Sequence, residues 1–168
     1  MPKPESDFDA LRDDLRQVYD GAPWHDGPIA AALAPVNAKT AARRSIPDSH
    51  TIWEIVLHMA GWTREVASRV RGADARDVPV DWPAQPDKPT EQEWSAARDD
   101  LRAAHEELVR AVDSLSPADL VRMVRDERST EIGRTVGSHI RGLLQHHTYH
   151  QGQIALLKKA SSNTGVSS

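Results

Sequence analysis

The sequence predicts an all-α protein, a four-helix bundle with long crossover connections. Apolar residues recur every three or four positions in four long segments, which is the spacing of one helix face. We find no convincing alternation of apolar and polar residues of the kind that is typical of a strand. Two connections between these segments are long and rich in proline, which favours crossovers over a plain up-down-up-down bundle.

The first helix is expected over residues 6–20, with Ser6 as its N-cap. Its apolar positions are Phe8, Leu11, Leu15 and Val18. Glycines and prolines interrupt residues 21–49, so we expect a long connection there. A short helix is expected near Pro28–Leu33, because proline suits the first turn of a helix.

The second helix is expected to begin at Thr51, which forms a Thr-x-x-Glu capping box with Glu54. Its apolar stripe comprises Ile52, Ile55, Met59, Trp62, Val66 and Val70. Gly72 is expected to end this helix. Four prolines indicate a loop over residues 73–89, and we expect Trp82 to anchor that loop to the bundle surface.

The third helix repeats the capping box with Thr90 and Glu93. Its apolar seam comprises Trp94, Ala97, Leu101, Ala104, Leu108, Ala111 and Leu115. The last helix is expected over residues 135–159. We therefore expect a single domain over residues 1–160, followed by a disordered polar tail over residues 161–168.

Composition excludes several classes of function. The chain of 168 residues has no cysteine, which excludes disulfides, thiolate nucleophiles and cysteine-based metal sites. Its 21 basic and 25 acidic residues argue against a nucleic-acid partner. No apolar run approaches the roughly 20 residues of a membrane span, and the N-terminal residues lack the apolar stretch of a signal peptide. We expect a soluble cytoplasmic protein without a membrane partner, in which eight histidines dominate the available metal chemistry.

The strongest candidate site is the pair His146 and His150 in the last helix. Residues four apart lie about 40° from each other around a helix and about 6 Å along it, so both imidazoles can reach one ion. The spacing alone also fits two hydrogen-bonded histidines at the edge of the core. His58 borders the apolar stripe of the second helix and would complete the three-ligand set of an open catalytic metal site.

Other residues near this set have simpler interpretations. Glu54 is a possible fourth ligand, but the capping box accounts for it. His147 lies about 100° around the helix from His146, so we expect it to pack or to donate a hydrogen bond. His139 is too far along the helix to share the ion, although it could line a substrate cleft.

The remaining positions are expected to be structural. His105 lies on the charged third helix and is expected to be solvated. His25 and His50 are expected at the surface or at a cap, with acid–base chemistry as the alternative. Gly152 is expected to allow close approach of a neighbouring helix, because it lacks a side chain.

Three stretches carry a resemblance to a known family. They are Trp24-His25-Asp26-Gly27-Pro28 with the run to Ser49-His50-Thr51-Ile52-Trp53-Glu54, then His58-Met59-Ala60-Gly61-Trp62, and finally His146 through Ile154. Together they resemble the DinB/YfiT-like superfamily of metal-binding four-helix bundles, which includes bacillithiol transferases and mycothiol-dependent enzymes. The resemblance covers roughly residues 5–160, and the order and spacing of its motifs agree with the family.

The resemblance implies that His58, His146 and His150 bind one divalent ion, zinc or nickel most commonly. It implies a homodimer and a metal-dependent enzyme that acts on a small-molecule substrate. A thiol S-transferase with a low-molecular-weight thiol cosubstrate is the leading hypothesis. A metal-dependent hydrolase and a non-catalytic metal-binding stress protein are the alternatives. The chain departs from the family at Gln151, where many members have arginine or alanine, and at Gly142, where members often have histidine.

Overall fold

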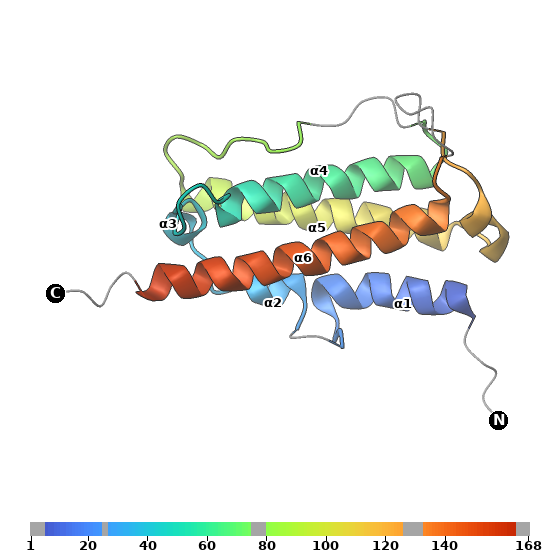
Figure 1. Cartoon of the computed structure of the whole chain (residues 1–168), viewed down its shortest axis with the longest axis horizontal. Helices are drawn as coiled ribbons and strands as arrows, with labels where there is room; N and C mark the ends of the chain where they lie inside the picture. The colour runs from blue at the N-terminus through green and yellow to red at the C-terminus, as the bar shows by residue number, and fades with distance from the viewer. Residues whose placement is uncertain (1–5, 25–26, 75–79, 126–132, 164–168) are drawn as a thin grey trace.

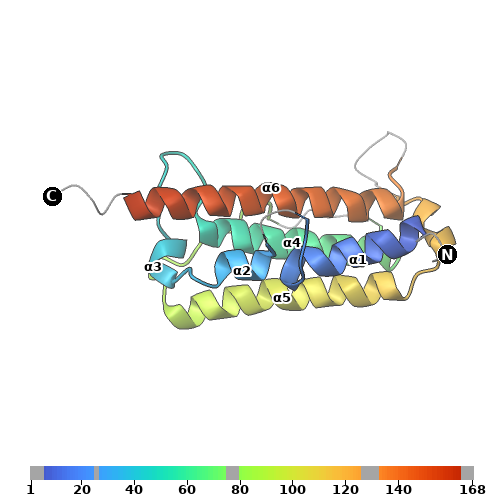
Figure 2. The same ribbon diagram turned by 90° about the horizontal axis from the view of Figure 1, so that it is seen from below.

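Four long helices form the body of the protein and pack side by side, as Figures 1 and 2 show. The computed structural model describes residues 6–24, 27–74, 80–125 and 133–163. The long helices are α1 (Asp7–Asp20), α4 (Ile52–Val70), α5 (Glu91–Asp113) and α6 (Val136–Asn163). The described residues contain no strand beyond one isolated bridge between Met123 and Thr135. The prediction of an all-α bundle is confirmed.

Side-chain caps begin these helices where the sequence predicts them. Ser6 accepts a hydrogen bond from a first-turn amide of α1. Thr51 with Glu54, and Thr90 with Glu93, form reciprocal capping boxes at the starts of α4 and α5. Each box satisfies amide groups that a helix leaves without partners at its N-terminus, so it fixes the residue at which the helix begins.

The order of the helices requires one connection to cross the whole bundle. In Figures 1 and 2, α1 and α6 run in one direction, and α4 and α5 run in the opposite one. Because α4 and α5 are parallel, the chain between them has to return along the length of α4. Gly72, with φ +102°, turns the backbone out of α4 at the start of this crossover.

The other long connection carries two short helices, the first of which continues the line of α1 (Figures 1 and 2). The helix α2 (Ile29–Leu33) lies where the sequence predicts it, whereas α3 (Ala38–Ala41) was not predicted. The middle of this connection is fixed to α5 by two hydrogen bonds. Trp94 Nε1 donates to the Val36 carbonyl at 2.6 Å, and the Ala38 amide donates to Glu91 Oε1 at 2.9 Å.

The C-terminal helix is longer than the sequence predicts. Helix α6 continues to Asn163, so residues 161–163 are helical and the expectation of a disordered tail is wrong for them. The rest of that tail, residues 164–168, lies outside the described residues. None of the described helices is long and apolar enough to cross a lipid bilayer.

A band of buried polar side chains separates two apolar clusters in the core. One cluster lies near the start of α4 and includes Ile55, Trp94 and Ile154. The other lies near the end of α4 and includes Leu108 and Ile140. The buried polar residues between these clusters are Thr63 on α4, His105 on α5, and His147, His150 and Gln151 on α6; His58 is buried next to them, at the edge of the first cluster. The histidines therefore lie inside the bundle, at the middle of its length.

His105 belongs to this band, and the expectation that it is solvated is wrong. Only 4% of His105 is exposed, and its ring stacks on Tyr19 with centroids 4.8 Å apart. Burial lowers the pKa of His105 from 6.5 to about 4. The position lies between Leu101 and Leu108 on the apolar seam of α5, so helical spacing predicts its burial although its neighbours in sequence are charged.

Replacing His105 with leucine is expected to make the free energy of unfolding less sensitive to pH. Below about pH 6.5 the unfolded chain takes up a proton at His105, whereas the folded chain does so only near pH 4. The wild type therefore loses stability as the pH falls through this window, by about 2 kcal/mol between pH 7 and pH 5 from this residue. Urea unfolding of the metal-free protein at both pH values measures the difference.

The matched control for this experiment is Trp24→Leu, which replaces a fully exposed ring with leucine and leaves every histidine in place. This variant is expected to keep the pH dependence of the wild type. Equal pH dependence in His105→Leu and the wild type would contradict the assignment of the acid-sensitive step to His105.

Candidate metal centre

Helices α4 and α6 bring three imidazole rings together at the middle of the bundle. His58 Nε2 lies 2.8 Å from His146 Nε2, and His150 Nε2 lies 2.9 Å from the same atom. One ligand atom from each ring lies within 4.8 Å of those of the other two. These are the three histidines that the sequence indicates, and together they form a cluster that could hold a metal ion.

The hydrogen bonds on the far side of two rings determine which nitrogen faces the cluster. His58 Nδ1 donates to the main-chain carbonyl of Asp81. His150 Nδ1 donates to Gln153 Oε1 at 2.6 Å. Because both acceptors require a proton on Nδ1, the Nε2 atom of each neutral ring carries a lone pair. Two lone pairs therefore point toward His146 Nε2.

A bound cation would satisfy both of these lone pairs, whereas hydrogen bonding within the cluster does not. His146 Nε2 can donate one proton at most, so it satisfies one of the two facing lone pairs and leaves the other unsatisfied. Protonation of the cluster is disfavoured, because burial, followed by the neighbouring rings of His150 and His58, lowers the pKa of His146 to about 4. The pKa of His150 is also lowered, first by burial. Three converging neutral imidazole nitrogens are a donor set suited to zinc or nickel.

The crossover connection supplies the groups that orient His58. Asp81 Oδ1 lies 3.4 Å from His58 Nδ1 and accepts a hydrogen bond from Trp62 Nε1 at 2.9 Å. The ring of Trp82 stacks on His58 with centroids 4.0 Å apart and on His50 with centroids 3.4 Å apart. The expectation that Trp82 anchors the loop is confirmed, and its anchor point is the candidate ligand His58. The sequence did not reveal Asp81, because no spacing rule relates a loop residue to a helix face.

The structure places the neighbouring candidates outside the cluster. Glu54 caps α4 and pairs with Arg44 Nη2 at 3.0 Å, which supports the simpler of its two interpretations. His147 is fully buried and donates to Thr63 Oγ1, 3.0 Å away, as expected. Thr63 in turn donates to the Met59 carbonyl at 2.7 Å. His25 lies outside the described residues.

Two predictions for the residues that follow the last histidine have different outcomes. A Cβ atom at Gly152 would meet nothing within 4 Å, so the expectation of a close helix approach there is wrong. Gln151 is buried, and its Nε2 donates to the Gly27 carbonyl at 2.5 Å. Gln151 therefore ties α6 to the connection before α2 and lies apart from the histidine cluster.

A cleft of about 440 Å³ opens onto the three histidines. Trp62, Val66 and Leu143 give it apolar walls. Its other described lining residues are Arg69, Asp81, Trp82, Arg134, Ser138, His139, Gly142, Tyr149 and the three histidines. The presence of His139 agrees with the alternative that it lines a substrate cleft.

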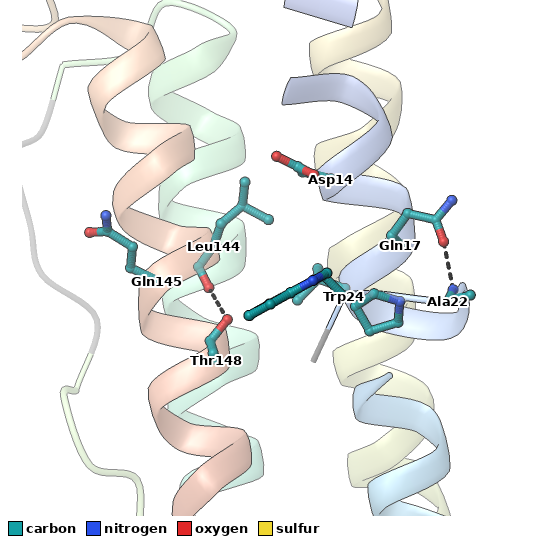
Figure 3. Close-up of a pocket in the computed structure, with 9 residues that line it drawn as sticks. Asp14, Gln17, Ala22, Trp24, Leu144, Gln145 and Thr148 are labelled. Carbon is teal, nitrogen blue, oxygen red and sulfur yellow. Dashed lines mark hydrogen bonds between the residues drawn. The ribbon is translucent and has the colours of Figure 1, made fainter. Parts of the chain in front are cut away.

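A second groove of about 650 Å³ lies between α1 and α6 (Figure 3). Leu144 and Thr148 line it from α6, and Trp24 extends toward them from the chain after α1. Residues 144 and 148 are on the side of α6 opposite to residues 146 and 150. None of the described residues that line this groove is a histidine, so the metal-binding potential belongs to the other cleft.

The fold and the cluster define a helical bundle with a candidate three-histidine metal site. The chain belongs to the DinB superfamily, whose family model matches residues 28–154. This match spans most of the chain and includes His58, His146 and His150. A search of the curated proteins returned no match.

Replacing His58 with alanine is expected to abolish stable metal binding. The wild type, produced without a histidine tag and loaded with zinc, should retain one ion per chain after dialysis, as measured by elemental analysis. His58→Ala leaves only two imidazoles in the cluster and should retain none. His139→Ala is the matched control, because His139 lines the same cleft outside the cluster. One retained ion in His58→Ala would exclude His58 as a required ligand.

Replacing Asp81 with asparagine is expected to weaken zinc binding about tenfold, the usual effect of losing a carboxylate that orients a ligand histidine. Binding should persist, because the main-chain carbonyl of Asp81 still accepts from His58. Competition with a chromophoric chelator measures the dissociation constant. Asp87→Asn, an exposed change in the same loop, is the control and should bind zinc as the wild type does. Equal affinity in all three proteins would show that the Asp81 carboxylate has no role in orienting His58.

Proposed function

We propose that this protein is a metal-dependent S-transferase that joins the sulfur of a low-molecular-weight thiol to a small electrophile. One divalent ion, zinc or nickel, would be bound by His58, His146 and His150. The observation that supports this proposal is a cluster of three ligand groups, rather than four, beside a cleft. Structural zinc sites are closed by four protein ligands, whereas catalytic sites keep a position open for substrate.

The absence of cysteine from the chain is consistent with a thiol that binds as a cosubstrate. A divalent ion in such a site supplies Lewis acidity, which brings the pKa of a thiol or a water molecule toward neutrality. The chain itself has no thiol, so the nucleophilic sulfur has to come from a second molecule. Three neutral imidazoles leave the full positive charge of an ion available to that molecule.

The proposed transfer balances without a further reactant. The thiol loses its proton, and its sulfur forms a bond to a carbon atom of the electrophile. The bond from that carbon to a leaving group breaks, and the leaving group departs with the electron pair. The proton released by the thiol neutralises the leaving group through solvent at the mouth of the cleft.

The residues of the chain have separate parts in this proposal. The imidazoles of His58, His146 and His150 hold the ion at one end of the cleft. Asp81 and Trp82 fix the orientation of the His58 ring. The apolar walls exclude water from the reacting atoms, which strengthens the electrostatic interactions made there.

Cobalt substitution tests the proposed function. Titration of the cobalt protein with 2-mercaptoethanol should produce a sulfur-to-cobalt charge-transfer absorption, whereas ethylene glycol should not. His146→Ala should show no such band. If no thiol changes the spectrum at millimolar concentration, the transferase proposal is wrong. Hydrolysis is the second candidate, because three neutral imidazole ligands also suit an ion that activates water.

A further inference from the structure

We infer that the cleft beside the three histidines binds an elongated molecule whose far end is a carboxylate held by Arg69 and Arg134. This inference rests on the proposed function and names the substrate class of the same site. The reacting end of the molecule would lie at the histidines, and an unbranched apolar segment would lie between the two ends.

The two arginines lie at the same end of the cleft, away from the histidines. Arg69 is eleven residues after His58 on α4, and Arg134 is twelve residues before His146, next to the start of α6. At about 1.5 Å per residue, the Cα atoms of both positions are roughly 16–18 Å from those of the histidines along the bundle. Because α4 and α6 run in opposite directions, these two displacements point the same way (Figure 1). The arginine side chains shorten the span that a ligand must cover, because the bond from Arg69 Nε to Glu65 shows that this side chain turns back toward the histidines.

Arg69 has an incomplete set of hydrogen-bond acceptors. Only 6% of this residue is exposed, and its Nε donates to Glu65 Oε1 at 2.7 Å. Its Nη2 is buried and has no acceptor among the residues that the structure describes. A buried guanidinium N–H without an acceptor is unfavourable, and a carboxylate is the acceptor that matches its geometry best. Arg69 lines the cleft, and a turn of its guanidinium toward the cleft would bring this shielded Nη2 to a ligand carboxylate at the same end.

Arg134 adds a second positive charge at this end of the cleft. Glu65 balances the charge of Arg69 but does not pair with Arg134. Its side chain is exposed, and no carboxylate of the described part of the chain pairs with it. The N-terminal end of α6 lies beside it and favours negative charge. The described lining of the cleft contains one carboxylate, Asp81, which lies at the histidine end. Among the described residues, the excess positive charge at the end of the cleft away from the candidate metal centre is therefore that of Arg134.

The middle of the cleft can accept an unbranched chain. Gly142 lies one helical turn before His146, and a Cβ atom there would meet nothing within 4 Å. The absence of a side chain at this position leaves the path from the histidines to the arginines open. Trp62, Val66 and Leu143 line this path with apolar surface. A row of methylene groups would bury its own apolar surface against them.

Two matched pairs of ligands test the inference by isothermal titration calorimetry of the zinc-loaded protein. One pair is 8-mercaptooctanoate and 8-mercaptooctanol, and the other is octanoate and octanol, which lack sulfur. The wild type should bind each carboxylate about tenfold more tightly than the corresponding alcohol. This preference should fall to less than about twofold in Arg134→Gln, an exposed substitution compatible with folding, and in Arg69→Gln.

Two glycine substitutions test the path between the ends. Gly142→Leu should weaken binding of 8-mercaptooctanoate at least tenfold and leave binding of 2-mercaptoethanol unchanged. Gly152→Leu is the matched control, because Gly152 is also a glycine of α6 with open space around its Cβ position but lines a different groove. Leucine favours a helix more than glycine does, so both variants should fold.

The possible outcomes separate this inference from the proposed function. Equal binding of carboxylates and alcohols, unaffected by the arginine variants, overturns the carboxylate site even if thiols give the cobalt charge-transfer band. Binding of octanoate that depends on Arg134, without a charge-transfer band from any thiol, supports the carboxylate site and overturns thiol transfer. Failure of all four ligands to bind overturns the inference.

Discussion

The convergence of three imidazole Nε2 atoms is the constraint on which the rest of the structure depends. Lone pairs on His58 and His150 face His146 where the cleft meets the interior of the bundle, and the rings of His58 and His150 are buried. Buried polar groups without partners destabilise a fold, and the low pKa of His146 disfavours a proton as the partner. The cluster therefore could hold a cation, and the helices that carry it have to be held in fixed register.

The two apolar clusters provide that register. They lie on either side of the polar band, so α4 and α6 are packed together both before and after the histidines. The crossover between α4 and α5 then brings Asp81 and Trp82 onto the outer side of His58. A bundle with only short antiparallel connections would lack this segment, because α5 would follow α4 directly. The crossover between α4 and α5 thus fixes the orientation of the His58 ring.

Local signals made most of the fold predictable from the sequence. The capping boxes at Thr51 and Thr90 mark helix starts because they depend only on residues three positions apart. The pair His146 and His150 was identified for the same reason, since four residues span one turn. Helix α3 was missed because four residues are too few to show a helical period.

Features that depend on tertiary contacts were not predictable in the same way. Asp81 reaches His58 across twenty-three positions of sequence, through a loop with no periodicity. His105 was assigned to solvent because its neighbours are charged, although its place on the apolar seam of α5 indicated burial. For Gly152, the sequence could not show that no backbone lies nearby. The missing acceptor of Arg69 Nη2 is likewise a property of the fold that no sequence pattern shows.

The most direct test of the central claim is the position of the ion in a crystal of the zinc-loaded protein. Anomalous diffraction measured on both sides of the zinc absorption edge locates the metal without reference to the surrounding atoms. If these three histidines are the ligands, each chain should show one peak, within coordination distance of Nε2 of His58, His146 and His150. A peak bound through other residues, or no peak at these three atoms, would contradict this assignment of the ligands.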